Sequence, residues 1–144
     1  MNQSITIGEC TVEECTTVLG LWTEAGSAKS ATDTVEVLGR LVINSGDLFL
    51  LARDGDNVIG SIIGGWDGWR GHIYRLAVSP RYRRLRVAER LTKELEGRLR
   101  AKGAEWIFAL VEMEKPYGTG FWNSPAAEGY HHAQGVGLYI KGAG

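Results

Sequence analysis

The stretch LAVSPRYRRLRVA at residues 76–88 joins an apolar strand, a short basic loop and the start of a helix. The apolar run at 72–78 predicts the strand, and Pro80 ends it. Apolar residues then recur at every fourth position from Val87 to Leu99, which predicts a long amphipathic helix. The first N–H groups of a helix have no partner within the helix and carry the positive end of its dipole. Residues 76–88 therefore predict an element that can hold a phosphate group.

The charge of this element agrees with phosphate binding. Five arginines lie between Arg81 and Arg90, and a guanidinium binds phosphate oxygens well. A solvated basic surface is the alternative interpretation, because runs of charge are usually exposed. The whole chain carries 16 basic and 17 acidic residues, a net charge of −1. That balance argues against a protein that coats nucleic acid.

The rest of the chain predicts one domain over residues 1–144, with an α/β fold of the α+β type. Its 144 residues are 44 % apolar, enough for a single core. Thr11-x-x-Glu14 and Asp33-x-x-Glu36 fit capping boxes at the starts of two helices. The other expected helices are 87–102 and a short one near Phe121-Trp122. The expected strands are 4–7, 47–53, 58–66, 72–78, a central strand at 106–111 and a last strand at 138–140.

In this order, the motifs resemble the GNAT superfamily of acyl-CoA N-acyltransferases, and its small bacterial members in particular. The loop of that family reads Val-x-Pro-x-Tyr/Phe-Arg-Gly-x-Gly-Ile/Val-Gly/Ala, and residues 78–88 read VSPRYRRLRVA. The turn GWDGWRG at 65–71, the helix end at Lys102-Gly103 and the pairs Phe121-Trp122 and Gly129-Tyr130 follow in family order. The resemblance covers nearly the whole chain.

The resemblance implies a mixed, mostly antiparallel sheet in the shape of a V. The sheet would part between the strand ending at Val78 and the strand ending at Val111. The pantetheine arm of acetyl-CoA would lie in that gap, beside the backbone of Leu76, Ala77 and Val78. The pyrophosphate would bind the loop and helix amides of Arg83, Arg84, Leu85, Arg86, Val87 and Ala88.

The chain departs from the family pattern at several positions. Arg84 and Arg86 replace the two loop glycines, which let the backbone approach phosphate closely. Each arginine either narrows the loop with its Cβ or binds phosphate with its guanidinium. Trp122 stands where the family often has a tyrosine acid, and Lys115 stands at the position of a loop asparagine.

Acyl transfer to an amine needs a base, a donor that polarises the thioester carbonyl, and an acid for the leaving thiolate. His72 matches the position of a glutamate base in several family members, and a structural histidine is the alternative. Alternation along the strand places His72 on the same face as Leu76. Glu112 and Glu114 are alternative bases or attract a cationic acceptor.

The remaining catalytic groups follow from the same resemblance. Tyr117 is the expected acid, because Tyr130 belongs to the glycine–aromatic pair and is expected to pack in the core. The backbone N–H of Ala77 or Val78 is the expected polariser of the carbonyl.

These residues predict an N-acetyltransferase that uses acetyl-CoA and a primary amine of a small molecule or a protein. The alternative is a non-catalytic acyl-CoA-binding module, which the changes at Arg84, Arg86 and Trp122 favour. No Cys/His spacing predicts a metal site, and Cys10 and Cys15 are expected to be reduced thiols of a cytoplasmic protein. No apolar run predicts a membrane span and no signal peptide is expected; a homodimer is possible.

Overall fold

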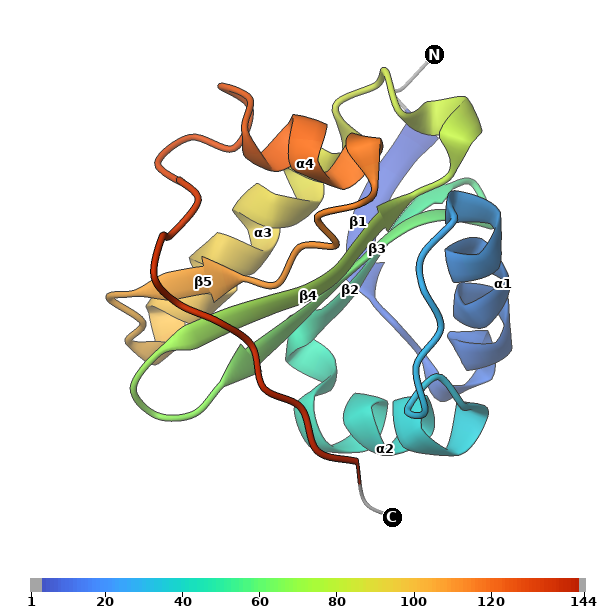
Figure 1. Cartoon of the computed structure of the whole chain (residues 1–144). Coiled ribbons are helices and arrows are strands. Elements are labelled where there is room, and N and C mark those ends of the chain that lie inside the picture. Colours follow the sequence, from blue (N-terminus) through green and yellow to red (C-terminus); the bar gives the residue numbers. More distant parts are fainter. Residues whose placement is uncertain (1–3, 143–144) are drawn as a thin grey trace.

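The computed structural model describes residues 4–142, which form one five-stranded sheet with helices on both faces (Figure 1). The strands are β1 (Ile5–Glu9), β2 (Phe49–Asp54), β3 (Asn57–Trp66), β4 (Gly71–Val78) and β5 (Ile107–Ala109). The helices are α1 (Cys15–Ala25), α2 (Val35–Ser45), α3 (Val87–Lys102) and α4 (Pro116–Trp122). The predicted fold class is therefore confirmed.

The strands lie side by side in chain order, β1 to β5. β1 to β4 pair antiparallel, and the β2–β3 hairpin closes through Gly55, whose φ of +60° suits a residue without a Cβ. Helix α3 then carries the chain back along the sheet, so that β5 runs parallel to β4. The sheet is mixed and mostly antiparallel, as predicted.

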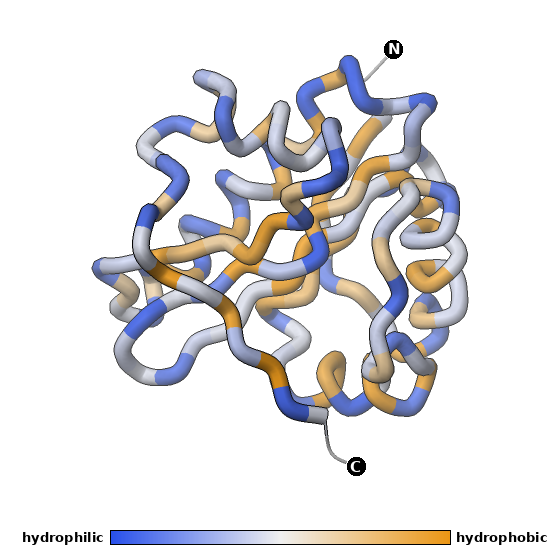
Figure 2. Tube along the Cα trace, viewed as in Figure 1, coloured by the Kyte–Doolittle hydropathy of each residue, from blue (hydrophilic) through white to orange (hydrophobic). Residues whose placement is uncertain are grey.

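Both faces of the sheet are buried, and β2 contributes side chains to the core on each face. Phe49 and Leu51 pack with Trp22 on the face covered by α1 and α2. Leu50, between them, points to the other face and belongs to the core with Leu95 of α3. Successive side chains alternate between faces, so a strand covered on both sides is apolar throughout. Figure 2 shows these apolar runs in the middle of the fold.

The two predicted helix starts have different outcomes. The capping box at Thr11 is present, with the Thr11 N–H donating to Glu14 Oε1 at 3.0 Å, although it opens a 3₁₀ turn before α1. The predicted cap at Asp33 is wrong. Thr34 caps α2 instead, because its hydroxyl accepts from the Val37 N–H at 3.2 Å. The Asp33 carboxylate instead forms an ion pair with Arg75 of β4.

The C-terminal segment corrects two further predictions. Residues 138–140 form no strand, and these residues are 65, 97 and 83 % exposed. Glycines at 135, 137 and 142 separate this short apolar run from other apolar residues, and Gly135 adopts a φ of +81°. With no strand beyond it in the described sheet, β5 is an edge strand rather than a central one. It is also shorter than the predicted 106–111.

Candidate active site

The sheet opens between β4 and β5. Gly71, His72 and Ile73 pair with Ile107, Phe108 and Ala109, and the Leu110 N–H donates to the Ile73 carbonyl at 3.0 Å. The paired register ends there, while β4 continues to Val78. The last residues of β4 are thus paired with β3 on one side and open toward the chain after β5 on the other. This is the V-shaped gap implied by the family resemblance.

A β-bulge in β4 lies where the two strands part. The register moves from Ile63 opposite Tyr74 to Ser61 opposite Ala77, so Arg75 and Leu76 together face the single residue between them on β3. Arg75 adopts a φ of +54°, which is rare for a residue with a Cβ. The extra residue breaks the alternation of the strand. A bend in β4 therefore accompanies the opening of the sheet.

The bulge overturns the prediction that His72 and Leu76 share one face. Tyr74 packs with the core under α1 and α2, whereas Leu76 packs with the core on the α3 side. His72 lies with Tyr74, since the His72 Nδ1 is 3.1 Å from the Tyr74 hydroxyl. The sequence carries no signal for the inserted residue, so simple alternation placed Leu76 on the wrong side.

The backbone of Val78 faces the gap. The Ser79 N–H donates to the Ile59 carbonyl of the neighbouring β3 at 2.8 Å, and Ala77 is paired with Ser61 of the same strand. Because backbone groups alternate in direction along a strand, Val78 between them points toward the open side. The Val78 carbonyl accepts from Arg83 Nε at 3.1 Å. Of the two predicted carbonyl polarisers, the Val78 N–H has the required direction and the Ala77 N–H does not.

Beyond Val78 the basic loop leads into α3. Arg86 precedes the helix in a left-handed conformation, with φ +59° and ψ +26°. The Arg90 N–H makes the first helical bond, to the Arg86 carbonyl at 3.0 Å. The N–H groups of Val87, Ala88 and Glu89 consequently have no partner within the helix. Arg86 thus adopts a conformation that a glycine at this position would take without strain.

The loop arginines differ in what they bind. Arg83 is bound to the protein, because Nη2 donates to the Ala25 carbonyl at 2.9 Å and the guanidinium stacks on Tyr117, 4.4 Å from the ring centroid. Arg84 and Arg86 are exposed. Both arginines that depart from the family pattern therefore have exposed side chains.

A hollow of about 610 Å³ lies between this loop and α4. Arg83, Arg84 and Arg86 line it on one side, and Tyr117 and Phe121 line it on the other. Its charge is mostly positive, which suits an anionic ligand such as a phosphate ester. The structure therefore brings the predicted acid together with the predicted phosphate-binding residues.

Tyr117 presents a neutral phenol to this hollow. Burial raises the pKa of its hydroxyl, and the Arg83 guanidinium opposes part of that shift by stabilising the phenolate. The phenol consequently keeps its proton at neutral pH and can donate it. Tyr130 packs against Trp122 with ring centroids 4.8 Å apart, which is the core position expected from the sequence.

His72 lies where β4 and β5 are still paired, and it is not among the residues that line the hollow beside Tyr117. It is paired with Phe108, and the two rings are 4.7 Å apart. Its Nε2 is 3.2 Å from Asp67 Oδ2, and its Nδ1 faces the Tyr74 hydroxyl. The sequence analysis predicted neither partner of His72. Asp67 lies in the turn just before the strand, so its contact with His72 could have been expected from the hairpin.

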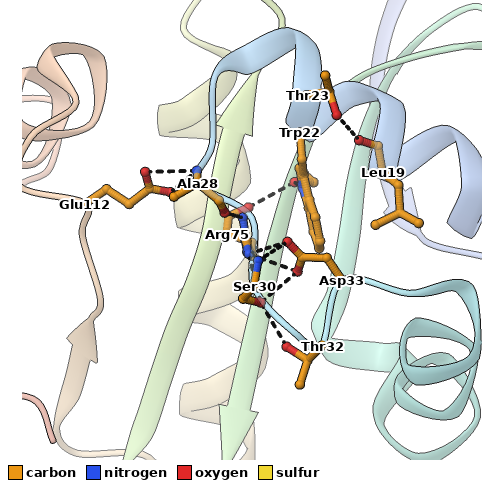
Figure 3. Close-up of polar contacts among 10 residues, drawn as sticks. Leu19, Trp22, Thr23, Ala28, Ser30, Thr32, Asp33, Arg75 and Glu112 are labelled. Carbon is orange, nitrogen blue, oxygen red and sulfur yellow. Dashed lines mark hydrogen bonds and ion pairs between the residues drawn. The ribbon is translucent and has the colours of Figure 1, made fainter. Parts of the chain in front are cut away.

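Glu112 follows β5 on the other border of the gap. Its two carboxylate oxygens accept from the N–H of Ala28, at 3.1 and 3.2 Å (Figure 3). Ala28 belongs to the loop between α1 and α2, so Glu112 holds that loop instead of standing free. Glu114, the second predicted carboxylate, is exposed.

Residues 4–142 bring no three His, Cys, Asp or Glu side chains together as a metal site. Within the same range, no helix has both the length and the apolar composition needed to cross a membrane. Cys10 and Cys15 are buried free thiols. Burial raises the pKa of the Cys10 thiol to about 12, which keeps it protonated and unreactive.

Comparisons with known proteins agree with this geometry. A profile of the acetyltransferase (GNAT) family matches residues 16–124. An acetyltransferase of Sodalis glossinidius (strain morsitans) is 37 % identical over 94 residues, which are 65 % of this chain and 66 % of that protein. The chain therefore matches slightly less than two thirds of the length of that relative.

Two solved structures share the fold. A probable acetyltransferase of meticillin-resistant Staphylococcus aureus superposes with a TM-score of 0.75 at 17 % identity, over 95 % of this chain and 98 % of that one. The PaiA N-acetyltransferase of Thermoplasma acidophilum, in complex with coenzyme A, gives 0.72 at 22 % identity, over 83 % and 87 %. The resemblance found in the sequence is confirmed, and the chain belongs to the acetyltransferase (GNAT) family.

Proposed function

We propose that this chain transfers the acetyl group of acetyl-CoA to a primary amine of a small molecule or a protein. The observation that carries the proposal is the gap between β4 and β5, which ends at a loop of unpaired helix amides and exposed arginines. Acetyl-CoA supplies an activated acyl thioester on a long arm that ends in a diphosphate. The gap suits the arm and the loop suits the diphosphate.

The residues present fit the diphosphate. The N–H groups of Val87 and Ala88 point out of the helix end, and Arg84 and Arg86 line the adjoining hollow. Charge-assisted hydrogen bonds from guanidinium to phosphate oxygens are about twice as strong as neutral ones. We therefore assign Arg84 and Arg86 to phosphate binding rather than to crowding of the loop.

Val78 is the proposed polariser of the thioester carbonyl. Its N–H faces the gap, and the β3–β4 ladder and the Arg83 contact to its carbonyl hold its direction. A fixed donor aimed at a developing oxyanion stabilises the transition state without any reorganisation at the moment of reaction.

His72 is the proposed base, and it acts through the Tyr74 hydroxyl. His72 itself lies where β4 is paired with β5. Tyr74 lies beyond this paired part, because it follows Ile73, the last residue of β4 paired with β5. The hydroxyl and the His72 Nδ1 are 3.1 Å apart, a distance suited to proton transfer. Asp67 at Nε2 orients the imidazole, because its carboxylate accepts a hydrogen bond from that nitrogen and leaves Nδ1 facing the Tyr74 hydroxyl.

Tyr117 is the proposed acid for the leaving thiolate. It lies on α4 across the hollow from the loop that would hold the diphosphate, and its burial keeps the phenol protonated. Protonation of the thiolate by a positioned phenol prevents its return to the acetyl product.

Thermal unfolding with acetyl-CoA or CoA tests the binding half of the proposal. A ligand at a hundred times its dissociation constant adds about 2.7 kcal/mol to the free energy of unfolding. A panel of amines read by thiol release then tests transfer. Binding without transfer would favour the acyl-CoA-binding module, for which the left-handed Arg86 is the supporting observation. A cytoplasmic location and a homodimer stay predictions.

A further inference from the structure

The loop at residues 26–33, which we call the strap, joins α1 to α2 and touches both borders of the gap (Figure 3). One contact is with Arg75 in the bulge of β4. The other is with Glu112, beyond the end of β5. The strap therefore bridges the two strands at the place where they part, on the face of the sheet covered by α1 and α2.

The contact with β4 is strong. Arg75 Nη2 lies 2.9 and 2.8 Å from the two carboxylate oxygens of Asp33, and these side chains are only 18 and 13 % exposed. Arg75 Nη1 also donates to the Ala28 carbonyl at 3.0 Å. Asp33 in turn accepts from the Ser30 N–H at 3.0 Å. The ion pair between Arg75 and Asp33, together with the bond to the Ala28 carbonyl, holds the strap to β4.

Arg75 also contacts α1 and β3. Its guanidinium lies 4.5 Å from the Trp22 ring centroid, and Trp22 Nε1 donates to the buried Ser61 hydroxyl at 2.8 Å. The Ser61 hydroxyl donates to the Arg75 carbonyl at 2.9 Å. The bulge and the strap are thus parts of one hydrogen-bonded network, which Arg75 joins through its backbone and its side chain.

The contact with Glu112 is weaker. The Glu112 side chain is exposed, and its two oxygens share a single neutral donor, the Ala28 N–H. Most of its acceptor sites face solvent and are available to a ligand, since a carboxylate offers about four lone-pair sites. An ammonium group carries three donors and a full charge, so it forms stronger bonds to Glu112 than a backbone amide does.

We propose that Glu112 is a latch on the strap, which a cationic acceptor opens by taking the carboxylate from the Ala28 N–H. The strap then stays on β4 through Arg75 and Asp33, and the passage between Ala28 and Glu112 is the acceptor's entrance. Glu112 selects amines by charge and positions them; the proton is removed elsewhere. This inference rests on the proposed amine acetylation, because it takes the acceptor to be an ammonium ion on entry.

Hydrogen exchange of the Ala28 amide, followed by NMR in the full chain with CoA bound, tests the latch. Glu112→Ala removes the acceptor of this N–H, so its exchange should quicken about tenfold or more without any amine. Glu112→Gln keeps an oxygen for the amide and loses the charge. The amide should stay protected in that variant, and added amine should no longer quicken its exchange.

Kinetics separate the latch from a purely structural contact. The amine that reacts fastest in the panel is used as substrate. Glu112→Gln should raise the KM for this amine about tenfold, which corresponds to the loss of one charge-assisted hydrogen bond. The KM for acetyl-CoA should stay unchanged. Glu105→Gln removes an exposed carboxylate at the other end of β5 and serves as the charge-matched control. Equal effects of the two variants would contradict the proposal.

The outcomes distinguish this inference from the proposed function. Unchanged Ala28 exchange in Glu112→Ala overturns the latch even if amines are acetylated. The latch is also overturned if no amine of the panel quickens the exchange of the Ala28 amide in the wild type. Amines that quicken the exchange without releasing thiol would support the latch and contradict acetyl transfer.

Discussion

The Arg83 guanidinium lies 4.4 Å from the centre of the Tyr117 ring, so one side chain links the phosphate loop to the proposed acid. Arg83 also donates to the Val78 carbonyl at 3.1 Å, next to the N–H that we assign to the thioester oxygen. Three parts of the site, from β4, the loop and α4, therefore depend on this residue. Its role is to position them, because its Nε and Nη2 donate to carbonyls of the protein itself.

Arg83→Ala should lower both stability and activity. It removes hydrogen bonds to the Val78 and Ala25 carbonyls and the stack on Tyr117, which amounts to about 2 kcal/mol of unfolding free energy. Urea denaturation measures the loss, and kcat should fall because Tyr117 is no longer held. Arg81→Ala is the control, since Arg81 makes one exposed ion pair at 3.5 Å and should change stability by less than about 0.5 kcal/mol.

Arg86→Gly should move stability and cofactor affinity in opposite directions. Glycine accepts the left-handed conformation without the strain that Arg86 bears, so the free energy of unfolding should rise by about 1 kcal/mol. Loss of the guanidinium should weaken acetyl-CoA binding about tenfold. Calorimetric titration together with a melting curve of the free protein reads both quantities.

Arg84→Gly tests the same assignment without the strain. Arg84 is exposed at the hollow and has no left-handed backbone to relieve, so affinity should fall and the free energy of unfolding should not rise. Tighter binding in both glycine variants would mean that the arginines crowd the loop. Unchanged affinity in both would mean that neither touches the cofactor.

The base assignment predicts matched effects of His72→Gln and Tyr74→Phe. Each change breaks the 3.1 Å contact between the imidazole and the phenol. Both variants should lose the rise of kcat/KM with pH that general-base catalysis produces, and both should keep the KM for acetyl-CoA. If His72→Gln alone alters the pH profile, a water rather than Tyr74 carries the proton. A wild-type profile in both variants would make His72 structural.

The ion pair between Glu14 and Arg53 predicts a pH-dependent part of the stability. The Arg53 guanidinium, 2.6 Å from Glu14 Oε1, holds the pKa of that carboxyl below its usual range. Because the folded-state pKa is depressed, the stabilisation is complete above the ordinary glutamate range and is lost as pH falls through the folded-state value. Glu14→Gln should therefore cost about 1 kcal/mol at pH 7, and much less in acid below that value.

The sequence predicts the regular elements of this fold well because their signals are local. Helix α3 spans the residues expected from the fourfold recurrence of apolar residues and from the terminal Gly103. The β2–β3 hairpin follows from its turn residues. The tail at 138–140 has the composition of a strand but no partner, and pairing is a tertiary property that composition does not contain.

The site is less predictable, because it depends on contacts between distant residues. The phosphate loop and Tyr117 follow from the family motif, and the structure brings them together. The bulge at Arg75 has no sequence signature, since arginine rarely adopts a positive φ. The pairing of Arg75 with Asp33 joins residues 42 positions apart, and local rules instead predict a helix cap at Asp33.

The most direct test of the account is acetyl transfer itself, measured as CoA thiol release together with the mass of the amine product. We predict that at least one primary amine gains the mass of one acetyl group in place of a hydrogen, in step with CoA release. That activity should fall in Tyr117→Phe while acetyl-CoA still binds. Acetyl-CoA that binds with no acetylated amine and no thiol release across the panel would contradict the account.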